Sequence, residues 1–317
     1  MTDARINHQV GVNYAVVMDL LHYSSRKLFE SLGVLKRYFL NPSPIIERHT
    51  ELEKELGLAS GAVDKSYDRI ERVFRTIQLP YHVVTVQDHS YPKLLATVSK
   101  PPPVLYVQGD LSLFSTSSVS VVGSRTPTEE GIKRAQKLAY LMVSNGLTVT
   151  SGLAKGIDSA AHNSAIRCGG RTIAVIGTPL DECYPKENTL LQQKIADSHL
   201  LVSQFPFSQP TAPFNFPARN YTMCGITKAT IIVEASETSG ALIQARFCLQ
   251  EGRNLFVLRN LLDRKDLTWP KTYVKRGAQV LERIEDVVEH LDAIHKNGNA
   301  ETAEEQLHLF ETAVDDD

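Results

Sequence analysis

Two short segments of this sequence combine glycines with a basic side chain, a pattern that suits the binding of a phosphate group. One reads VGSR at positions 122–125, and the other reads SGLAKGID at positions 151–158. Glycine lets the backbone approach a ligand closely, and free backbone NH groups at the start of a helix attract an anion. The arginine and the lysine add positive charge. The residues that we expect to form this phosphate cradle are Gly123, Ser124, Arg125, Ser151, Gly152, Lys155 and Gly156.

Both segments also have structural interpretations. An arginine in a turn often pairs with a nearby acid, so VGSR taken alone favours ligand binding and structure about equally. Neither segment has the spacing of the GxGxxG dinucleotide motif or of a Walker loop. Asp158 is expected to cap the helix that follows it. His162, in the first turns of that helix, is expected to be a hydrogen-bonded structural residue rather than a general base.

A third segment, FNFPARNY at positions 214–221, places aromatic rings beside a cation and an amide. Single-stranded nucleic acid needs this combination, because bases stack on rings while arginine holds the backbone. Such rings are also common in protein cores, so their position at a strand end carries the functional interpretation. We predict binding roles here for Phe216, Arg219 and Asn220.

A fourth segment starts at Ser239 and Gly240, where small residues precede a helix. Such a start suits a contact with a phosphate or with a nucleic-acid backbone. Close packing of the helix on a sheet explains the small residues almost as well.

The four segments follow short β-branched runs that alternate with helical stretches. Apolar strands separated by amphipathic helices are typical of a parallel sheet covered on both faces. The sequence therefore predicts an α/β fold with an extended, Rossmann-like, doubly wound and mostly parallel sheet. Ligands of such folds bind beyond the carboxyl ends of the strands, where all four segments lie. The predicted strands span residues 119–122, 148–150, 172–176, 200–203, 230–233 and 255–258.

Three regions of the chain differ in pattern. Residues 1–80 carry apolar residues at helical spacing and predict a small helical module. The Rossmann-like domain is expected over residues 81–292, after a proline-rich connector. Residues 293–317 form an acidic tail that we expect to be disordered. Apolar residues in the last helical segment before this tail suit either the core or an interface between two copies of the chain.

The composition limits the possible partners. A net charge of −2 excludes a protein coated in positive charge, although nucleic-acid binding needs only a local basic stripe. A basic run from Arg253 to Arg276 provides one candidate stripe, and a solvated face is its commoner meaning. Four scattered cysteines without a CxxC pair predict neither a disulfide framework nor a metal site, and we expect no cofactor. Because we find no long apolar run and no secretion signal, we expect a cytoplasmic protein that does not contact membranes.

Taken in order, the motifs resemble those of the DprA/Smf family of DNA-processing proteins. The set comprises VGSR, SGLAKGID followed by AH, Tyr184-Pro185 with Asn188, FPARN, SGALIQA, and Gly252-Arg253. It covers roughly residues 91–282. Each motif alone is weak, but the ordered set is highly specific.

The resemblance implies a function. Members of the family bind single-stranded DNA, form homodimers and load the recombinase RecA during transformation, and a divergent member would act in phage defence or plasmid biology. The resemblance implies no catalytic residue. The family's DNA pocket, carried over by matching motifs, comprises Arg125, Lys155, Phe216, Arg219 and Asn220.

A second interpretation is a sensor or enzyme for a nucleotide-derived small molecule, because the same superfamily includes LOG-like phosphoribohydrolases. Their site needs a PGGxGT stretch followed by a catalytic glutamate. Residues 234–240 read EASETSG instead, so we rank this interpretation second.

Near the C-terminus, residues 306–310 read QLHLF within an acidic stretch. A disordered segment has no core in which to bury such residues, so they are idle, dock on the chain's own surface or serve a partner's groove. The pentapeptide resembles the QLxLF consensus by which bacterial proteins bind the replicative sliding clamp. The predicted clamp-binding residues are Gln306, Leu307, Leu309 and Phe310.

Overall fold

The sheet is the centre of the molecule. A computed structural model describes residues 2–297, with side chains described from residue 7 to residue 291. Within this part of the chain, nine strands form one sheet in the order β1-β2-β6-β5-β4-β3-β7-β8-β9. The strands are β1 (His82–Thr85), β2 (Val104–Gly109), β3 (Ser118–Gly123), β4 (Thr148–Ser151), β5 (Thr172–Val175), β6 (Leu200–Ser203), β7 (Ala229–Glu234), β8 (Asn254–Leu258) and β9 (Gln279–Leu281).

The strand directions confirm the predicted α/β class. All neighbours from β6 to β9 pair in parallel, and only β1 and β2 are antiparallel additions at one end. The six predicted strands match β3 to β8 to within one or two residues. We did not predict β1, β2 or β9. The first two flank the segment that we assigned to a proline-rich connector, and β9 opens the segment that we assigned to a helix.

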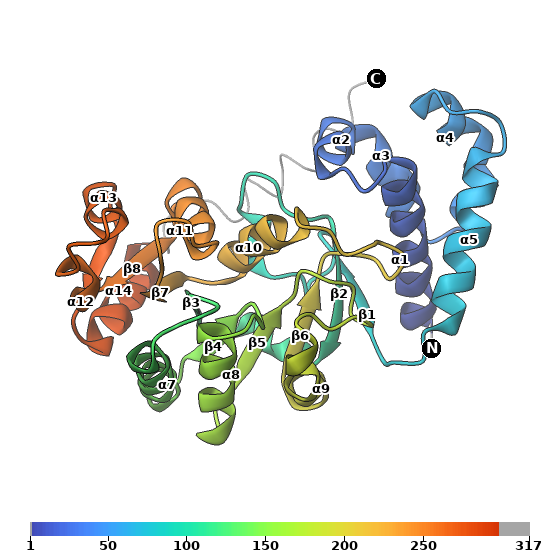
Figure 1. Cartoon of the computed structure of the whole chain (residues 1–317). Coiled ribbons are helices and arrows are strands. Elements are labelled where there is room, and N and C mark those ends of the chain that lie inside the picture. Colours follow the sequence, from blue (N-terminus) through green and yellow to red (C-terminus); the bar gives the residue numbers. More distant parts are fainter. Residues whose placement is uncertain (1, 298–317) are drawn as a thin grey trace.

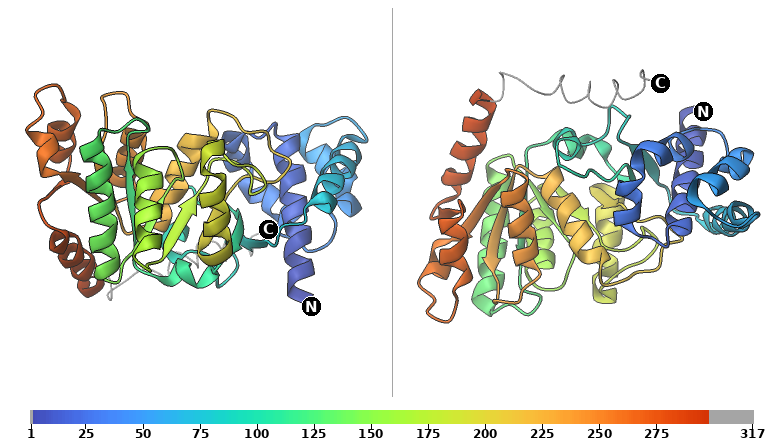
Figure 2. Two further views of the ribbon diagram at one scale, coloured as in Figure 1. Left: turned by 60° about the horizontal axis from the view of Figure 1, so that its bottom comes forward. Right: turned by 90° about the horizontal axis from the view of Figure 1, so that it is seen from above.

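Helices cover both faces of the sheet (Figures 1 and 2). One face packs against α6, α10, α11 and α13, and the other against α7, α8, α9 and α14. The helices of the sheet domain are α6 (Lys93–Ala96), α7 (Glu129–Ser144), α8 (Ile157–Arg167), α9 (Thr189–Ser198), α10 (Asn215–Ile226), α11 (Ala241–Gln250), α12 (Arg259–Leu262), α13 (Trp269–Lys275) and α14 (Ile284–Asn297). This layering confirms the predicted doubly wound arrangement.

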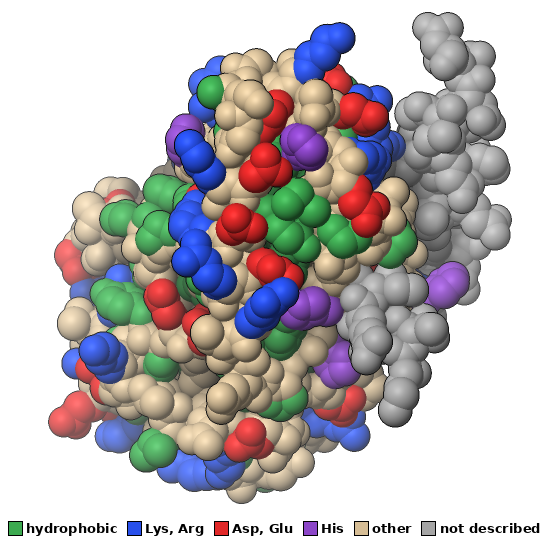
Figure 3. All heavy atoms as spheres, turned by 90° about the vertical axis from the view of Figure 1, so that its right-hand side faces the viewer, with side chains coloured by type: hydrophobic (Ala, Val, Ile, Leu, Met, Phe, Trp, Pro, Cys, Tyr) green, Lys and Arg blue, Asp and Glu red, His purple; other side chains and the backbone are tan. Residues whose placement is uncertain are grey.

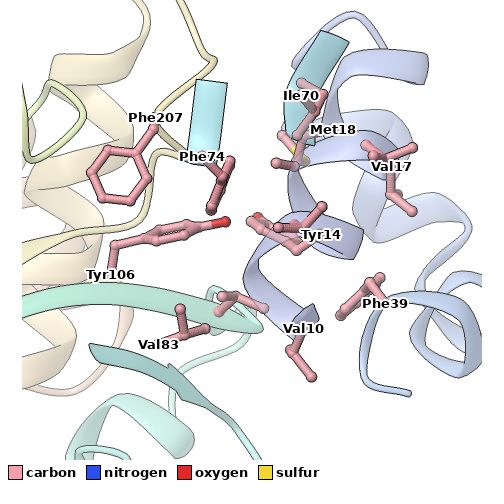
Figure 4. Packing of buried hydrophobic residues seen from close by; sticks show 14 of the residues in the cluster. Val10, Tyr14, Val17, Met18, Phe39, Ile70, Phe74, Val83, Tyr106 and Phe207 are labelled. Carbon is pink, nitrogen blue, oxygen red and sulfur yellow. The ribbon is translucent and has the colours of Figure 1, made fainter. Parts of the chain in front are cut away.

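Five helices precede the sheet and pack on its β1–β2 end. They are α1 (Thr2–Leu20), α2 (Ser25–Glu30), α3 (Leu32–Phe39), α4 (His49–Leu56) and α5 (Ala62–Thr76). Figure 4 shows the contact, in which Phe74 of α5 meets Tyr106 of β2 and Phe207. The ring centroids of Phe74 and Phe207 lie 5.3 Å apart, and the Tyr106 hydroxyl donates a 2.7 Å hydrogen bond to the Gly11 carbonyl. The apolar core is therefore continuous across the boundary that we placed near residue 80, and the division of the chain into two domains there stays a prediction.

The outer face of these N-terminal helices mixes charges of both signs (Figure 3). Arg37 pairs with Glu55 and Arg75 with Glu71, both at 2.8 Å. Interleaved pairs on an exposed face cancel at a distance and stabilise little. The helical module therefore presents no uniform basic surface on this face.

The last helical segment joins the core of its own chain. Leu281, Ile284, Val287 and Leu291 are buried against α7 and β8, which is the structural alternative that we left open. The helix α14 ends at Asn297, so the first residues of the predicted tail are helical. The clamp-binding motif lies outside the described residues. Of the helices between residues 2 and 297, none is long and apolar enough to cross a membrane.

His162 makes the stability of this fold depend on pH. Its ring is fully buried on α8, and Nδ1 lies 2.6 Å from the Thr172 hydroxyl, which confirms the predicted structural role. Burial, together with the nearby His199 and Arg219, lowers the pKa of His162 to about 3. The unfolded chain binds a proton near pH 6.5, whereas the folded chain does not. The contribution of the neutral His162 ring to stability is therefore fully present above about pH 6.5, and it is lost as the pH falls toward 3.

We expect the free energy of unfolding to fall by up to about 2 kcal/mol between pH 7 and pH 5 through this one group. The variant His162→Gln should lose this part of the pH dependence, because glutamine does not titrate. Urea unfolding at several pH values measures the slope. His82→Gln, at an exposed position on β1, is the control for the substitution itself and should change the free energy of unfolding at pH 7 by no more than about 0.5 kcal/mol. An equal slope in the wild type and His162→Gln would contradict the assignment.

Candidate nucleic-acid interface

The carboxyl ends of β3, β4 and β7 meet the start of α10 around one cleft. The cleft has a volume of about 600 Å³. Parallel strands bring their carboxyl ends to one edge, so segments far apart in the sequence become neighbours there. The predicted residues that line this strand-edge cleft are Gly123, Ser124, Arg125, Phe216, Arg219, Asn220, Ser239 and Gly240.

The turn after β3 holds Arg125 toward solvent. The Ser124 NH donates to the Glu234 carbonyl at 2.7 Å, and the Ser124 hydroxyl accepts from the Thr126 NH at 3.1 Å. The Arg125 guanidinium lies 5.4 Å from the centroid of the Phe216 ring and forms no ion pair with another described residue. A guanidinium stacked on a ring keeps its donors available in the ring plane. This position favours ligand binding over structural pairing for Arg125.

Buried side chains stabilise the turn after β4. The Asp158 carboxylate accepts from the NH groups of Gly152 and Ala154, at 3.1 and 3.3 Å, so our prediction that Asp158 caps its own helix is wrong. Leu153 has a φ of +56°, and its carbonyl accepts a 2.8 Å hydrogen bond from Asn188. A carboxylate bonded to NH groups on both sides of Leu153 stabilises a turn conformation that a non-glycine residue rarely adopts.

Two predicted residues of this turn face inward. The Ser151 hydroxyl is buried and donates to the Val121 carbonyl at 2.6 Å. The NH of Gly152 is bonded to Asp158 and its carbonyl to Arg219. We therefore correct their expected role: Ser151 and Gly152 support the turn, and their polar groups are not free for a ligand.

Lys155 and Gly156 do not line the cleft themselves but directly follow Ala154, which does, so they lie at its rim. The Lys155 side chain is 62% exposed, and its Nζ is 3.3 Å from a Glu187 carboxylate that is itself exposed. Such a pair is weak in water, so a phosphate can displace it. Gly156 has a φ of +84°, and a Cβ there would lie 2.4 Å from the Ser124 carbonyl oxygen. Glycine at this position lets the two turns touch, which brings Lys155 close to Arg125.

Aromatic side chains form one wall of the cleft. The Phe216 ring, in the first turn of α10, packs over Gly177, where a Cβ would come within 2.8 Å of a ring carbon. Its centroid is 5.4 Å from that of Tyr184. Tyr184 and Phe214 are 52% and 54% exposed. We did not predict either as a binding residue. The signal was present, since each is an aromatic residue beside a proline in a loop.

Arg219 is the largest departure from our site prediction. The sequence suggested an exposed cation, but the residue is only 4% exposed. Its Nη1 donates to the carbonyls of Gly152 and Val175, the latter at 2.7 Å. Burial lowers the pKa of Arg219 to about 10, while the nearby Asp158 opposes this shift. The guanidinium thus remains charged at neutral pH and ties α10 to the ends of β4 and β5, so we no longer expect it to reach a ligand directly.

Asn220 continues this connection toward α11. Its amide oxygen accepts from Arg219 Nε at 3.0 Å, and its Nδ2 donates to the Gly240 carbonyl at 3.3 Å. The Ser239 hydroxyl accepts from the Ala241 NH at 3.3 Å, at the predicted start of the helix. Among the described residues, no group of His, Cys, Asp or Glu side chains is arranged to hold a metal ion.

Comparison with known proteins decides the family. The model of the DNA recombination-mediator protein A family matches residues 82–292, which is most of the chain. The chain belongs to this family. The DprA/Smf resemblance predicted from the motifs is thus confirmed, and the match begins at β1, just beyond the helical module.

Relatives support the assignment. Protein Smf of Synechocystis is 39% identical over 215 residues, which cover 67% of this chain and 54% of the relative. DNA processing protein DprA of Bacillus subtilis is 30% identical over 251 residues, covering 78% of this chain and 84% of that protein. The chain spans only part of the length of several of these relatives, between half and two thirds for Synechocystis Smf and for Streptococcus pneumoniae DprA.

Solved structures of the family share the fold. The X-ray structure of DprA from Streptococcus pneumoniae superposes with a TM-score of 0.68 at 28% identity, covering 91% of this chain and 98% of that one. The DprA structure from Helicobacter pylori, described for its unique single-stranded DNA binding mode, has a TM-score of 0.59 at 28% identity and covers 68% of this chain and 96% of its own.

The buried Arg219 makes Gly152 intolerant of a side chain. A Cβ at Gly152 would lie 2.1 Å from Arg219 Nη1, so Gly152→Ala must displace the guanidinium from its carbonyl partners. We expect a loss of about 1 to 3 kcal/mol in the free energy of unfolding. Gly33→Ala, in the first turn of α3 where a Cβ would meet no neighbour, is the control and should stabilise by up to about 1 kcal/mol. Urea unfolding compares the two, and an unchanged midpoint for Gly152→Ala would show that Arg219 is not held there.

Proposed function

We propose that this protein binds single-stranded DNA in the strand-edge cleft and acts as a recombination mediator. The observation that carries the proposal is the exposed Arg125 guanidinium lying over the Phe216 ring at the mouth of an open cleft. The ring stacks a base, and the guanidinium holds the adjoining phosphate. Lys155 adds a second cation at the rim.

The aromatic side chains beside these cations favour single strands over duplex DNA. Phe216, Tyr184 and Phe214 offer ring faces that only unpaired bases can reach. A duplex hides its base faces and leaves only phosphates for contact. The related structure from Helicobacter pylori, described for its single-stranded DNA binding mode, supports the same ligand for this chain.

The two exposed cations should dominate the salt dependence of binding. In the double variant Arg125→Ala, Lys155→Ala we expect a large loss of affinity for oligothymidine. The slope of log K against log salt should fall by about 1.4, because each phosphate contact on a single strand contributes about 0.7. Fluorescence anisotropy at several salt concentrations measures both quantities.

A matched control removes the same charge elsewhere. Arg26→Ala, Lys194→Ala alters two exposed residues on α2 and α9, outside the residues that line the cleft. It should bind as the wild type does. Equal affinity of the wild type and the Arg125, Lys155 double variant would remove the proposal.

Phe216 allows stacking to be separated from packing. Phe216→Leu keeps an apolar side chain over Gly177 but removes the aromatic face. We expect a loss of about 1 to 3 kcal/mol in binding free energy with an unchanged salt slope, because stacking involves no counterion release. The same anisotropy titration applies, with thermal unfolding to show that the fold persists. A lower salt slope with unchanged affinity at low salt would mean that Phe216 acts only by positioning Arg125.

We infer that the cleft binds without catalysing a reaction. In the phosphoribohydrolase alternative a glutamate near the loop after β7 would act on the substrate. Here the Glu234 carboxylate accepts hydrogen bonds from the Thr128 NH, at 2.9 Å, and from the Thr128 hydroxyl, at 2.6 Å. These bonds stabilise the start of α7. Turnover of nucleoside monophosphates that disappears in Lys155→Ala would reverse this ranking.

Three partner proposals rest on family resemblance and on the tail sequence. We propose RecA as a partner and a homodimer as the assembly. The apolar residues that we had considered for the interface are buried within the chain, so a dimer would use another surface. Sedimentation at micromolar concentration tests the dimer, and a monomer alone would remove it.

The clamp-binding proposal rests on residues 306–310 alone. We expect weak binding to the bacterial sliding clamp, because ordering a tail offsets much of the contact energy. Calorimetry with purified clamp should show binding by the wild type and none by Leu309→Ala, Phe310→Ala. Equal heats from the two proteins would contradict the motif.

A further inference from the structure

A second hollow adjoins the strand-edge cleft, on the outer side of the sheet's covering helices. It lies between α7 and α8, has a volume of about 530 Å³, and shares Arg125 and Thr126 with the strand-edge cleft, while Lys155 lines only this second hollow. Its eleven lining residues include three basic ones and no acid. The third basic residue is Arg167, at the end of α8.

The two helices run side by side in a fixed register, as the two green helices in the left view of Figure 2 show. At one end Gly156 lies against Pro127, and further on the Ser164 hydroxyl donates to the Gln136 carbonyl at 2.7 Å. At the far end Gly170 lies against Val143. These contacts keep nearly the same residue offset throughout, so the groove is continuous from one end to the other.

One face of α8 lines this groove with polar groups. Ser159, Asn163 and Arg167 follow one another at intervals of four residues, which places them on the same side of a helix. Asn163 and Arg167 are exposed, and Arg167 forms no ion pair or hydrogen bond with another described residue. A cation without a protein partner at the end of a polar stripe is available for an anionic ligand.

The opposite helix supplies an aromatic residue at the same level. Ile132 and Gln136 of α7 line the groove, and Tyr140 follows one turn later with 53% of its surface exposed. The offset that places Gln136 opposite Ser164 places Tyr140 opposite Cys168, the residue that follows Arg167. This end of the groove therefore has both an exposed ring and an unpaired cation, the two side-chain types that Phe216 and Arg125 supply in the strand-edge cleft.

We propose that the single strand leaves the strand-edge cleft past Arg125 and Lys155 and continues along the α7–α8 groove, where Arg167 binds its backbone and Tyr140 stacks a base. This inference rests on the proposed function, since the same polyanion must occupy both sites. The eleven residues of α8 span about 16 Å, which is room for up to about five stacked nucleotides.

Two acids near the groove are already paired with basic side chains. Glu130, at the start of α7, lies 3.4 and 4.0 Å from Lys133 and Arg134, and Glu187 lies 3.3 Å from Lys155 in the weak exposed contact described above. An acidic peptide is the competing occupant, because it also carries negative charge. The aromatic residue at the Arg167 end of the groove and the continuity with the strand-edge cleft favour a strand of bases.

Oligonucleotide length separates the two sites. In the full chain, Arg167→Ala should leave the affinity for the shortest oligothymidines unchanged, because these fill only the strand-edge cleft. For long oligothymidines it should weaken binding about three- to tenfold and lower the salt slope by about 0.7, as expected for one lost phosphate contact. Tyr140→Ala should weaken the same long oligonucleotides without changing the slope, and Tyr140→Phe should retain wild-type binding.

The control is Arg171→Ala. This exposed arginine lies close to Arg167 in the sequence, but it pairs with Asp110 at 3.6 Å and does not line the groove. It should bind every oligonucleotide as the wild type does. Unfolding midpoints equal to that of the wild type show that each variant is folded.

The outcomes distinguish this inference from the function on which it rests. Failure of the wild type to bind any oligothymidine overturns both. Normal binding by the wild type with identical length dependence in Arg167→Ala overturns only the extension into the groove. Polyglutamate that binds with the same dependence on Arg167, and as tightly as long oligothymidine, would mean that the groove takes an acidic protein segment instead.

Discussion

The buried guanidinium of Arg219 is the contact on which the strand-edge cleft depends. It belongs to α10 and donates to carbonyls at the ends of two adjacent strands, β4 and β5. The helix α9 and the strand β6 separate α10 from β5 in the sequence. A guanidinium without partners is very costly inside a protein, so every alternative position of α10 is strongly disfavoured. Arg219 therefore fixes the position of the first turn of α10, and with it the position of Phe216.

The charges of the cleft divide into an inner and an outer set. Inside, Asp158 lies near Arg219, and burial raises the pKa of this carboxyl while the guanidinium opposes the shift. Outside, Arg125 and Lys155 are exposed, and among the described residues only Glu187 makes an ion pair with either of them. Because Arg219 is buried and donates to two backbone carbonyls, the field felt by a ligand comes mainly from the outer cations. A chain with a small negative net charge can thus present a local positive site.

The fold was largely predictable because parallel strands that are buried on both faces appear in the sequence as continuous runs of β-branched residues. The antiparallel pair was not, since β1 has only four residues and β2 follows three prolines. For the site, the residue types pointed to one edge of the sheet, and Arg125 and Lys155 face solvent there. The direction of a side chain was a different matter. Arg219 and Asp158 turn inward because α10 and the β4 turn approach each other closely, and that distance depends on packing that no local pattern contains.

The joint in Figure 4 bears on the order in which the chain folds during synthesis. The helices α1 and α5 emerge first, yet Phe207, Leu201 and Ala174, which complete their core, are made much later. Until then Phe74 and Tyr14 have only part of their apolar neighbours. A ribosome-bound chain therefore holds a loosely packed helical segment through the synthesis of most of the sheet, and its closure waits for long-range contacts with high entropic cost. Chaperone binding to nascent chains of this protein should accordingly centre on the N-terminal helices.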